Sequence, residues 1–279
     1  MTRFERPESV AEAARLLAAG EWAVLAGGTD LYPAHVGRQL AAPVLDITGI
    51  AGLRGIRRER DGGWTIGATT TWTDVLRADL PPLFDGLKAA ACEVGGVQIQ
   101  NAGTVAGNVC NASPAADGAP ALMALDASVV LQSERGERAL PVERFVQGNR
   151  RTARAADELV VAIRMPPRSA NARSVFLKLG GRRYLTISMT MVAIVIDADA
   201  SGTVTYAAAA VGSCAVVARR LPALETRLVG ARVDDALDLL VGPSDLVPLV
   251  PIDDLRATAD YRRDATLTLL RRSLKALRA

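Results

Sequence analysis

Two glycine-bearing segments, far apart in the sequence, constrain this chain more than any other feature. The first is VLAGGTDL at residues 24–31, and the second is NAGTVAGNV at residues 101–109. Small residues leave the main chain uncovered, so that backbone amides can approach a phosphate, and a following helix favours negative charge. Either segment alone is weak evidence, because glycine pairs close many strand-to-helix turns. Together they are suited to hold both halves of a pyrophosphate.

Two common phosphate motifs are absent from these segments. Neither has the spacing G-x-x-x-x-G-K-[ST], and neither has G-x-G-x-x-G within a strand–helix unit. A dinucleotide bound by some other fold is the interpretation that remains.

Histidine and cysteine usage limits the chemistry further. His35 is the only histidine, which argues against a Ser-His-Asp triad and against multi-histidine metal sites. Cys92, Cys110 and Cys214 are widely spaced and form no CxxC pair, so we predict neither a disulfide framework nor a protein-held iron–sulfur or zinc site. We name no metal ligand and no catalytic acid, base or nucleophile, and we expect a reducing, cytoplasmic location.

Composition predicts a globular protein with a substantial core. Hydrophobic residues make up 49% of the 279 residues and charged residues 23%, with a net charge of +3. The basic runs GIRRER and GNRRTAR lack interleaved aromatic residues, so nucleic acid is not implied. The charged, helix-like N-terminus predicts no signal peptide, and no apolar run is long enough to predict a membrane span.

Local patterns predict an α+β organisation for the first part of the chain. The ranges expected as helices are 7–20, 31–40, 70–80, 83–94 and 119–127. Strands are expected at 21–26, 43–47 and 158–166 and in two hairpins over 53–68 and 128–142. The stretch from Gly95 to Gly118 is expected to be a glycine-rich loop.

The pattern of the sequence changes after Pro166-Pro167, from mixed helices and strands to long extended runs followed by helices. We take this proline pair as the linker between domains 1–167 and 168–279. Three extended runs, 174–185, 187–198 and 202–212, predict an antiparallel meander. Helices are expected over 215–228, 233–241 and 254–279, the last capped by Asp253 or Asp254.

The chain resembles the FAD-binding medium subunit of molybdenum hydroxylases, the group that includes bacterial xanthine dehydrogenases and aerobic carbon monoxide dehydrogenase. The resemblance rests on RPESVAEAARLL, LAGGTDL, IGATTTWTDV, IQNAGTVAGNVCNASPAADGAPALMALDA, FLKLGGRRYLTIS and LRATADYRR, which occur in order over nearly the whole chain. It implies a two-domain flavoprotein: an N-terminal FAD-binding domain of the vanillyl-alcohol-oxidase (PCMH) type, and a C-terminal three-stranded antiparallel sheet backed by helices.

The resemblance also implies the cofactor contacts, with FAD held noncovalently. The first segment would be formed by Val24, Leu25, Ala26, Gly27, Gly28, Thr29, Asp30 and Leu31, and the second by Thr104, Val105, Ala106, Gly107 and Asn108. Asp117 would contact the adenosine portion, Val160 would lie near the adenine, and Lys178 near the flavin.

Simpler interpretations exist for several of these residues. Asp117 could merely cap the following helix, and Lys178 could be a solvated edge residue. Arg182-Arg183 could meet a phosphate or a partner, or form an exposed turn. Ala106 stands where the family usually has glycine, and its methyl group is tolerable only if the backbone φ is negative. Thr186 replaces a common aspartate.

By resemblance, the chain is the flavin subunit of a complex that contains a large molybdopterin-binding subunit and a small subunit with two [2Fe–2S] clusters, as a dimer of heterotrimers. FAD would pass electrons to NAD⁺, a quinone or oxygen. Two alternatives stay open: a free-standing flavin oxidoreductase with its own substrate, and a scaffold that has lost flavin. Copurification tests the first, and a visible spectrum tests the second.

Overall fold

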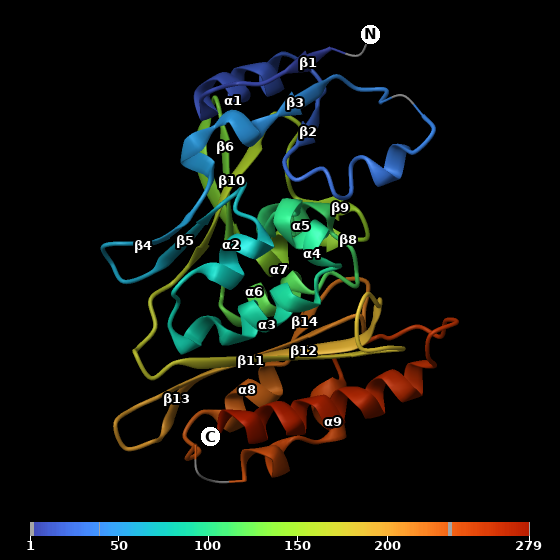
Figure 1. Cartoon of the computed structure of the whole chain (residues 1–279). Helices are drawn as coiled ribbons and strands as arrows, with labels where there is room; N and C mark the ends of the chain where they lie inside the picture. The colour runs from blue at the N-terminus through green and yellow to red at the C-terminus, as the bar shows by residue number, and fades with distance from the viewer. Residues whose placement is uncertain (1–2, 39, 234–235, 279) are drawn as a thin grey trace.

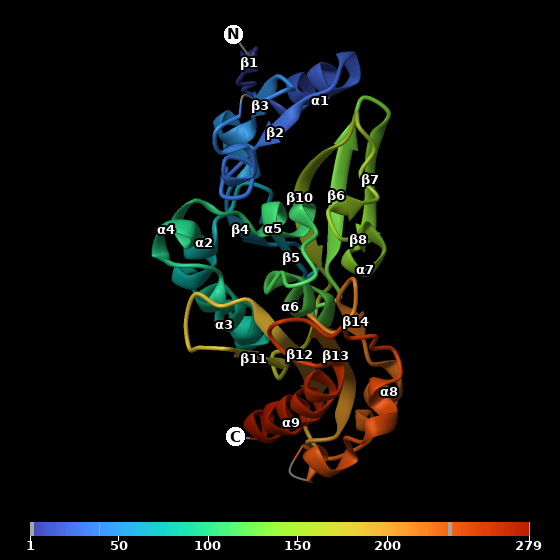
Figure 2. The same cartoon turned by 90° about the vertical axis from the view of Figure 1, so that its right-hand side faces the viewer.

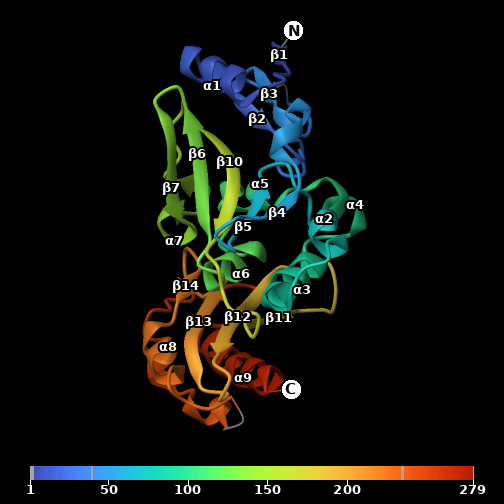
Figure 3. The ribbon, with the colours of Figure 1, turned by 90° about the vertical axis from the view of Figure 1, so that its left-hand side faces the viewer.

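The computed structural model describes residues 3–38, 40–233 and 236–278. The described chain is elongated, with the N-terminal and C-terminal ends at opposite extremes (Figure 1). A small parallel sheet, a larger antiparallel sheet with its helices, and a C-terminal sheet backed by helices follow one another between these ends (Figures 1 and 3).

The first sheet is parallel and has the order β1-β3-β2. Helix α1, Val10–Ala19, begins where the Ser9 hydroxyl accepts the Glu12 N–H at 3.2 Å. Helix α1 confirms the helix predicted over 7–20, and strands β2 and β3 confirm the strands predicted over 21–26 and 43–47. The strands are β1 (Phe4–Glu5), β2 (Ala23–Leu25) and β3 (Val44–Asp46).

The helix predicted over 31–40 is wrong. Only one 3₁₀ turn forms there, Pro33–His35, and residue 39 lies outside the described residues. Gly37 has φ +72°, a left-handed conformation that a helix cannot contain. Apart from the 3₁₀ turn, residues 31–38 form turns and a bend.

The second sheet is antiparallel, in the order β4-β5-β10-β6-β7. Its hairpins and last strand were predicted, whereas α7 (Val142–Phe145) and the short β8–β9 ribbon were not. The strands are β4 (Ile56–Arg58), β5 (Trp64–Gly67), β6 (Ser128–Ser133), β7 (Gly136–Pro141), β8 (Val146–Gly148), β9 (Arg151–Thr152) and β10 (Leu159–Met165).

Helices α2 (Trp72–Arg77), α3 (Asp85–Glu93) and α6 (Gly118–Ala124) confirm three predicted helices. The glycine-rich stretch between α3 and α6, expected as a loop, contains two more: α4 (Val97–Ala102) and α5 (Val105–Asn111). Glycine and asparagine have weak helix propensity, so short helices of this composition depend on tertiary packing. That dependence explains why the local pattern did not reveal them.

The C-terminal sheet has the order β11-β12-β13-β14 and is antiparallel. Its long strands β11 (Arg173–Gly180), β12 (Ser188–Ala198) and β13 (Val204–Gly212) confirm the predicted meander. The edge strand β14, Arg219–Arg220, adds a short fourth member. Helices α3 and α6 pack on one face, and α8 (Pro222–Leu228) and α9 (Ala259–Leu277) cover the other (Figure 2).

Strand β12 contributes to two hydrophobic cores. Met191, Ala193 and Val195 face the core shared with α3 and α6, and the alternate residues Val192 and Ile194 face α8 and α9. Side chains alternate along a strand, and here both faces are covered, so the run reads as continuously apolar. The core that β12 shares with α3 and α6 therefore contains residues from both sides of position 167, so the two parts of the chain pack against each other through one continuous interior.

Three further C-terminal predictions need correction. Within 215–228 the helix begins only at Pro222, and within 233–241 only a 3₁₀ turn, Leu237–Leu240, is present, residues 234–235 being outside the described chain. The N-cap residue of helix α9 is Thr258, whose hydroxyl accepts the Tyr261 N–H at 3.2 Å, so the helix begins later than predicted. Asp253 still contributes to this end, because its Oδ1 accepts the N–H of Ala259, the first residue of the helix, whereas Asp254 accepts backbone N–H groups that precede the helix. The other 3₁₀ turns are Ile47–Gly49, Ala51–Leu53, Pro82–Phe84 and Pro243–Leu246.

Among the described helices, none combines the length and apolar character needed to cross a bilayer.

Candidate cofactor site

The first glycine segment begins where β2 ends, and its two glycines are required by the geometry. A Cβ on Gly27 would lie 2.0 Å from the carbonyl oxygen of Ala102, far inside contact distance. Gly28 has a backbone φ of +70°, a conformation that residues other than glycine rarely adopt. The absence of a side chain at Gly27 thus lets the turn lie directly against the end of α4.

The second segment is the start of a helix and not a loop. Thr104 precedes α5, and its Oγ1 accepts the Gly107 N–H at 2.9 Å. Ala106 lies in the first turn of α5 with a helical, negative φ, and its side chain is buried in the core. The backbone φ of Ala106 is thus negative, as a methyl group at this position requires.

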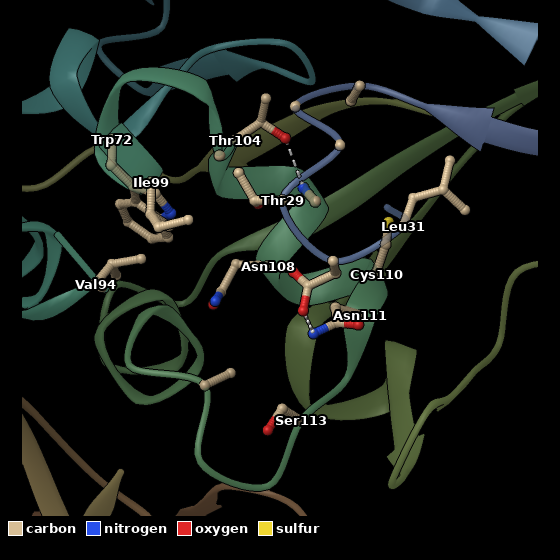
Figure 4. A pocket seen from close by; sticks show the side chains of 18 of the residues that line it. Thr29, Leu31, Trp72, Val94, Ile99, Thr104, Asn108, Cys110, Asn111 and Ser113 are labelled. Carbon is tan, nitrogen blue, oxygen red and sulfur yellow. Dashed lines mark hydrogen bonds between the residues drawn. The ribbon is translucent and has the colours of Figure 1, made fainter. Parts of the chain in front are cut away.

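Polar contacts join the first segment to α5, the helix that begins in the second segment. Asn111, the last residue of α5, donates from Nδ2 to Asp30 Oδ1 at 2.7 Å. The Arg150 guanidinium lies 3.7 Å from the same oxygen. Figure 4 shows the Asp30–Asn111 bond as a dashed line beside the cavity. The side chain of Asn111 therefore links α5 to the first segment.

The two segments border one cavity of about 550 Å³. This volume is in the range of small-molecule and cofactor sites. Trp72, Val94 and Ile99 form an apolar part of the wall, and Thr29 and Asn108 form a polar part (Figure 4). The cavity therefore combines an apolar surface that suits a planar ring with polar groups and bare backbone that suit a phosphate bridge.

One buried acceptor in this wall has no partner within the described structure. The Asn108 side-chain oxygen is inaccessible to solvent and receives no hydrogen bond from any described residue. An unsatisfied buried polar atom costs free energy of about 1–3 kcal/mol, so this oxygen gains a partner if the Asn108 amide turns toward a donor in the cavity. Together with the uncovered backbone at Gly27, the Asn108 amide fits a cofactor with hydroxyl or N–H groups.

Comparison of the chain with known protein families identifies the family to which it belongs. Residues 1–168 match the family described as the FAD binding domain in molybdopterin dehydrogenase, and residues 176–277 match the CO dehydrogenase flavoprotein C-terminal domain. The chain belongs to this family of flavoproteins. It is thus an FAD-binding protein of the molybdenum hydroxylase family, as the resemblance indicated.

Several relatives agree with this assignment. The caffeine dehydrogenase subunit beta of Pseudomonas sp. (strain CBB1) is 32% identical over 95% of this chain and 87% of its own length. The xanthine dehydrogenase FAD-binding subunit of Escherichia coli O157:H7 is 34% identical, but the matched part spans only 65% of its length. A solved carbon monoxide dehydrogenase from Hydrogenophaga pseudoflava has a chain that superposes with a TM-score of 0.87 at 29% identity, covering 99% of this chain and 96% of that one.

The flavoprotein's predicted contact residues fall into two groups. Those that line the cavity come from both segments and from Asp117: Val24, Ala26, Gly27, Gly28, Thr29, Asp30, Leu31, Thr104, Gly107, Asn108 and Asp117. Those that do not line it are Leu25, Val105 and Ala106, which are buried beside the segments, and Val160 and Lys178. Direct FAD contacts for all of these residues stay predictions.

Val160 and Lys178 lie apart from the cavity for different reasons. Val160 is buried in the centre of the second sheet, in β10, where it pairs with Leu131 of β6. Lys178 lies in β11 and borders a separate hollow with Arg182 and Arg183. Its side chain is buried, so it is not the solvated edge residue that the strand pattern allowed. The turn at Arg182-Arg183 is exposed.

Asp117 precedes α6 but does not cap it with its side chain. Its carboxylate instead accepts hydrogen bonds from Lys178 Nζ at 2.9 Å and from Ser188 Oγ at 3.0 Å. Burial raises the pKa of this carboxyl above its usual value, and Lys178 and Ser188 act in the opposite direction. The helix-cap interpretation is therefore replaced by a contact with the C-terminal sheet.

Sequence reasoning missed several residues of the cavity wall. Trp72, Val94 and Ile99 belong to helices or their ends and give no local signal beyond an apolar pattern, which core residues share. His35 also borders the cavity, and its Nδ1 lies 2.8 Å from the Leu31 carbonyl oxygen. Within the described residues, no three His, Cys, Asp or Glu side chains are grouped so that they could hold a metal ion.

Proposed function

We propose that this chain is the electron-transfer flavin subunit of a molybdenum-containing dehydrogenase and holds FAD noncovalently in the cavity between its two small-residue segments. The observation that supports this most directly is the approach of the first glycine turn to the second segment. A Cβ on Gly27 would lie within 3 Å of both Ala102 and Gly103, so the two segments form a single wall.

The proposed roles follow from the chemistry of the wall. The backbone at Gly27, Gly28 and Thr29, with the Thr29 hydroxyl, would donate hydrogen bonds to the pyrophosphate. Asn108 would accept a hydrogen bond from a hydroxyl or N–H group of the dinucleotide. The apolar side chains of Trp72 and Ile99 suit a planar ring and exclude water from it. FAD, when bound, supplies reversible uptake and release of two electrons, and the protein orients it and sets its electrostatic surroundings.

The partner subunits are inferred from the relatives of this chain and not from its own residues. The carbon monoxide dehydrogenase relative of Hydrogenophaga pseudoflava is named a medium chain, and the caffeine dehydrogenase relative a subunit. We infer a large molybdopterin-binding subunit and a small [2Fe–2S] subunit, arranged as a dimer of heterotrimers in the cytoplasm. Electrons would arrive from the [2Fe–2S] clusters and leave to NAD⁺, a quinone or oxygen. The domain boundary at 167/168 is part of the same proposal.

A visible spectrum of the purified full-length chain tests the cofactor assignment. We expect the absorption bands of oxidised flavin, and we expect FAD to be released when the protein is denatured, because the attachment is noncovalent. A colourless protein that takes up no added FAD would contradict the proposal and support the scaffold alternative.

Copurification from the native host tests the assembly. A tagged chain is expected to bring a molybdenum-containing large subunit and a small iron–sulfur subunit with it. A lone chain that binds FAD and oxidises a small substrate by itself would support the free-standing oxidoreductase instead.

A further inference from the structure

The carboxylate of Asp117 connects the cofactor cavity to the C-terminal sheet. Asp117 borders the cavity but is only 8% exposed. Each of its oxygens has a different partner: Oδ2 accepts from Lys178 Nζ at 2.9 Å, and Oδ1 accepts from Ser188 Oγ at 3.0 Å. Both partners come from the C-terminal half of the chain.

These two partners occupy neighbouring strands of one sheet. Lys178 is near the end of β11 and Ser188 is the first residue of β12, and the strands pair at Gly180 and Ser188. The Lys178 and Asp117 side chains are 5% and 11% exposed, so the pair is removed from water. Lys178 Nζ also lies 3.4 Å from the Glu93 carbonyl oxygen at the end of α3. A buried pair with these additional hydrogen bonds has a defined geometry, unlike an exposed ion pair.

We propose that Lys178 and Ser188 are positioning residues of the FAD site, which hold the Asp117 carboxylate at the cavity wall so that the C-terminal sheet completes the site. This inference rests on the proposed function. Lys178 then acts on the cofactor through Asp117 and not by direct contact, in agreement with its absence from the cavity wall. The Asp117 carboxylate, fixed in this way, accepts a hydrogen bond from a hydroxyl or N–H group of the dinucleotide.

The charges around Asp117 support the same arrangement. Burial raises the pKa of its carboxyl, the Lys178 ammonium group lowers it, and the carboxylate of Glu93 raises it. If Lys178 is removed, burial and the Glu93 carboxylate favour the protonated form of Asp117. The protonated carboxyl group has one acceptor oxygen fewer for the cofactor. In a Lys178→Met variant, the affinity for FAD is expected to weaken as the pH falls, at pH values where the unmodified chain is unaffected.

A double-mutant cycle on the full chain tests the proposal, with FAD as the probe and flavin fluorescence as the measurement. Lys178→Met and Asp117→Asn are each expected to weaken FAD binding about tenfold or more, which is the magnitude of a lost charged hydrogen bond. If Lys178 acts only through Asp117, Lys178→Met has no further effect in the Asp117→Asn background. A further loss in the double variant shows direct contact and overturns the proposal.

Conservative variants and a matched control separate this role from general stability. Lys178→Arg is expected to restore most of the affinity, and Ser188→Ala to weaken binding by a smaller factor without unfolding the chain. Lys275→Met removes another ion pair with a buried carboxylate, that of Asp238 at 3.3 Å, and is expected to leave FAD binding unchanged.

The outcomes for this inference and for the proposed function can be distinguished. If the unmodified chain does not bind FAD, the proposed function fails. If it binds FAD and both Lys178→Met and Ser188→Ala bind it equally well, the cofactor assignment stands and the positioning role is overturned.

Discussion

The close approach at Gly27 yields the sharpest quantitative prediction. In a Gly27→Ala variant, the new Cβ would lie 2.0 Å from the oxygen and 2.7 Å from the carbon of the Ala102 carbonyl, and 2.9 Å from Gly103 Cα. All three atoms belong to the main chain, so no side chain can rotate to relieve the contact. The first segment must therefore move away from α4 by about 1.4 Å to bring this 2.0 Å contact to ordinary van der Waals separation.

This displacement affects binding more than stability. An added methyl group in a close-packed region costs about 1–3 kcal/mol of unfolding free energy, which a chain of this size can tolerate. Both segments border the cavity, so the same movement misaligns the groups proposed to hold the pyrophosphate. Loss of two hydrogen bonds to a charged phosphate, at about 1.5 kcal/mol each, corresponds to roughly a hundredfold, and we expect the dissociation constant for FAD to rise by a factor of that order.

Fluorescence titration of the full chain with FAD measures this effect, and thermal unfolding of the apoprotein measures the stability cost. Gly52→Ala is the matched control: it makes the same chemical change in a short 3₁₀ turn, and a Cβ there meets nothing within 4 Å. The control is expected to bind FAD normally. If Gly27→Ala also binds FAD with unchanged affinity, the first segment does not need its close contact with α4, and the proposed pyrophosphate site is wrong.

Three further predictions concern single contacts. Asn111→Ala removes the hydrogen bond to Asp30 and is expected to weaken FAD binding about fivefold in the same titration, because the first segment loses its side-chain link to α5. Thr71→Ala removes the hydroxyl that caps α2 and should lower the free energy of unfolding by about 1 kcal/mol in urea denaturation. Arg138 lowers the pKa of the buried Glu158 carboxyl below its usual value of 4.5, so this pair's stabilisation is complete above that pH and is lost as the pH falls through the lowered pKa. Glu158→Gln should abolish that part of the acid dependence of unfolding, and an unchanged acid profile would contradict the assignment.

Local rules predicted many of the elements correctly. The apolar pattern of α1 and the extended apolar runs of β11–β13 depend on residues that are close together in the sequence. The same kind of reasoning failed where the determinants were not local. The helix predicted over 31–40 is interrupted by the left-handed backbone at Gly37, and α4 and α5 form within a stretch whose composition suggested a loop.

By itself, the sequence determined that bare backbone is available at two distant segments and that the chain resembles a flavoprotein family. Only the tertiary structure decided that Gly27 touches Ala102, that Asp117 is held by Lys178 and Ser188, and that Val160 lies in a sheet centre away from the cavity. The physical reason is the range of the interactions. Helix caps and strand alternation depend on residues a few positions apart, whereas a close approach or a buried ion pair between segments more than sixty positions apart depends on how the whole chain packs.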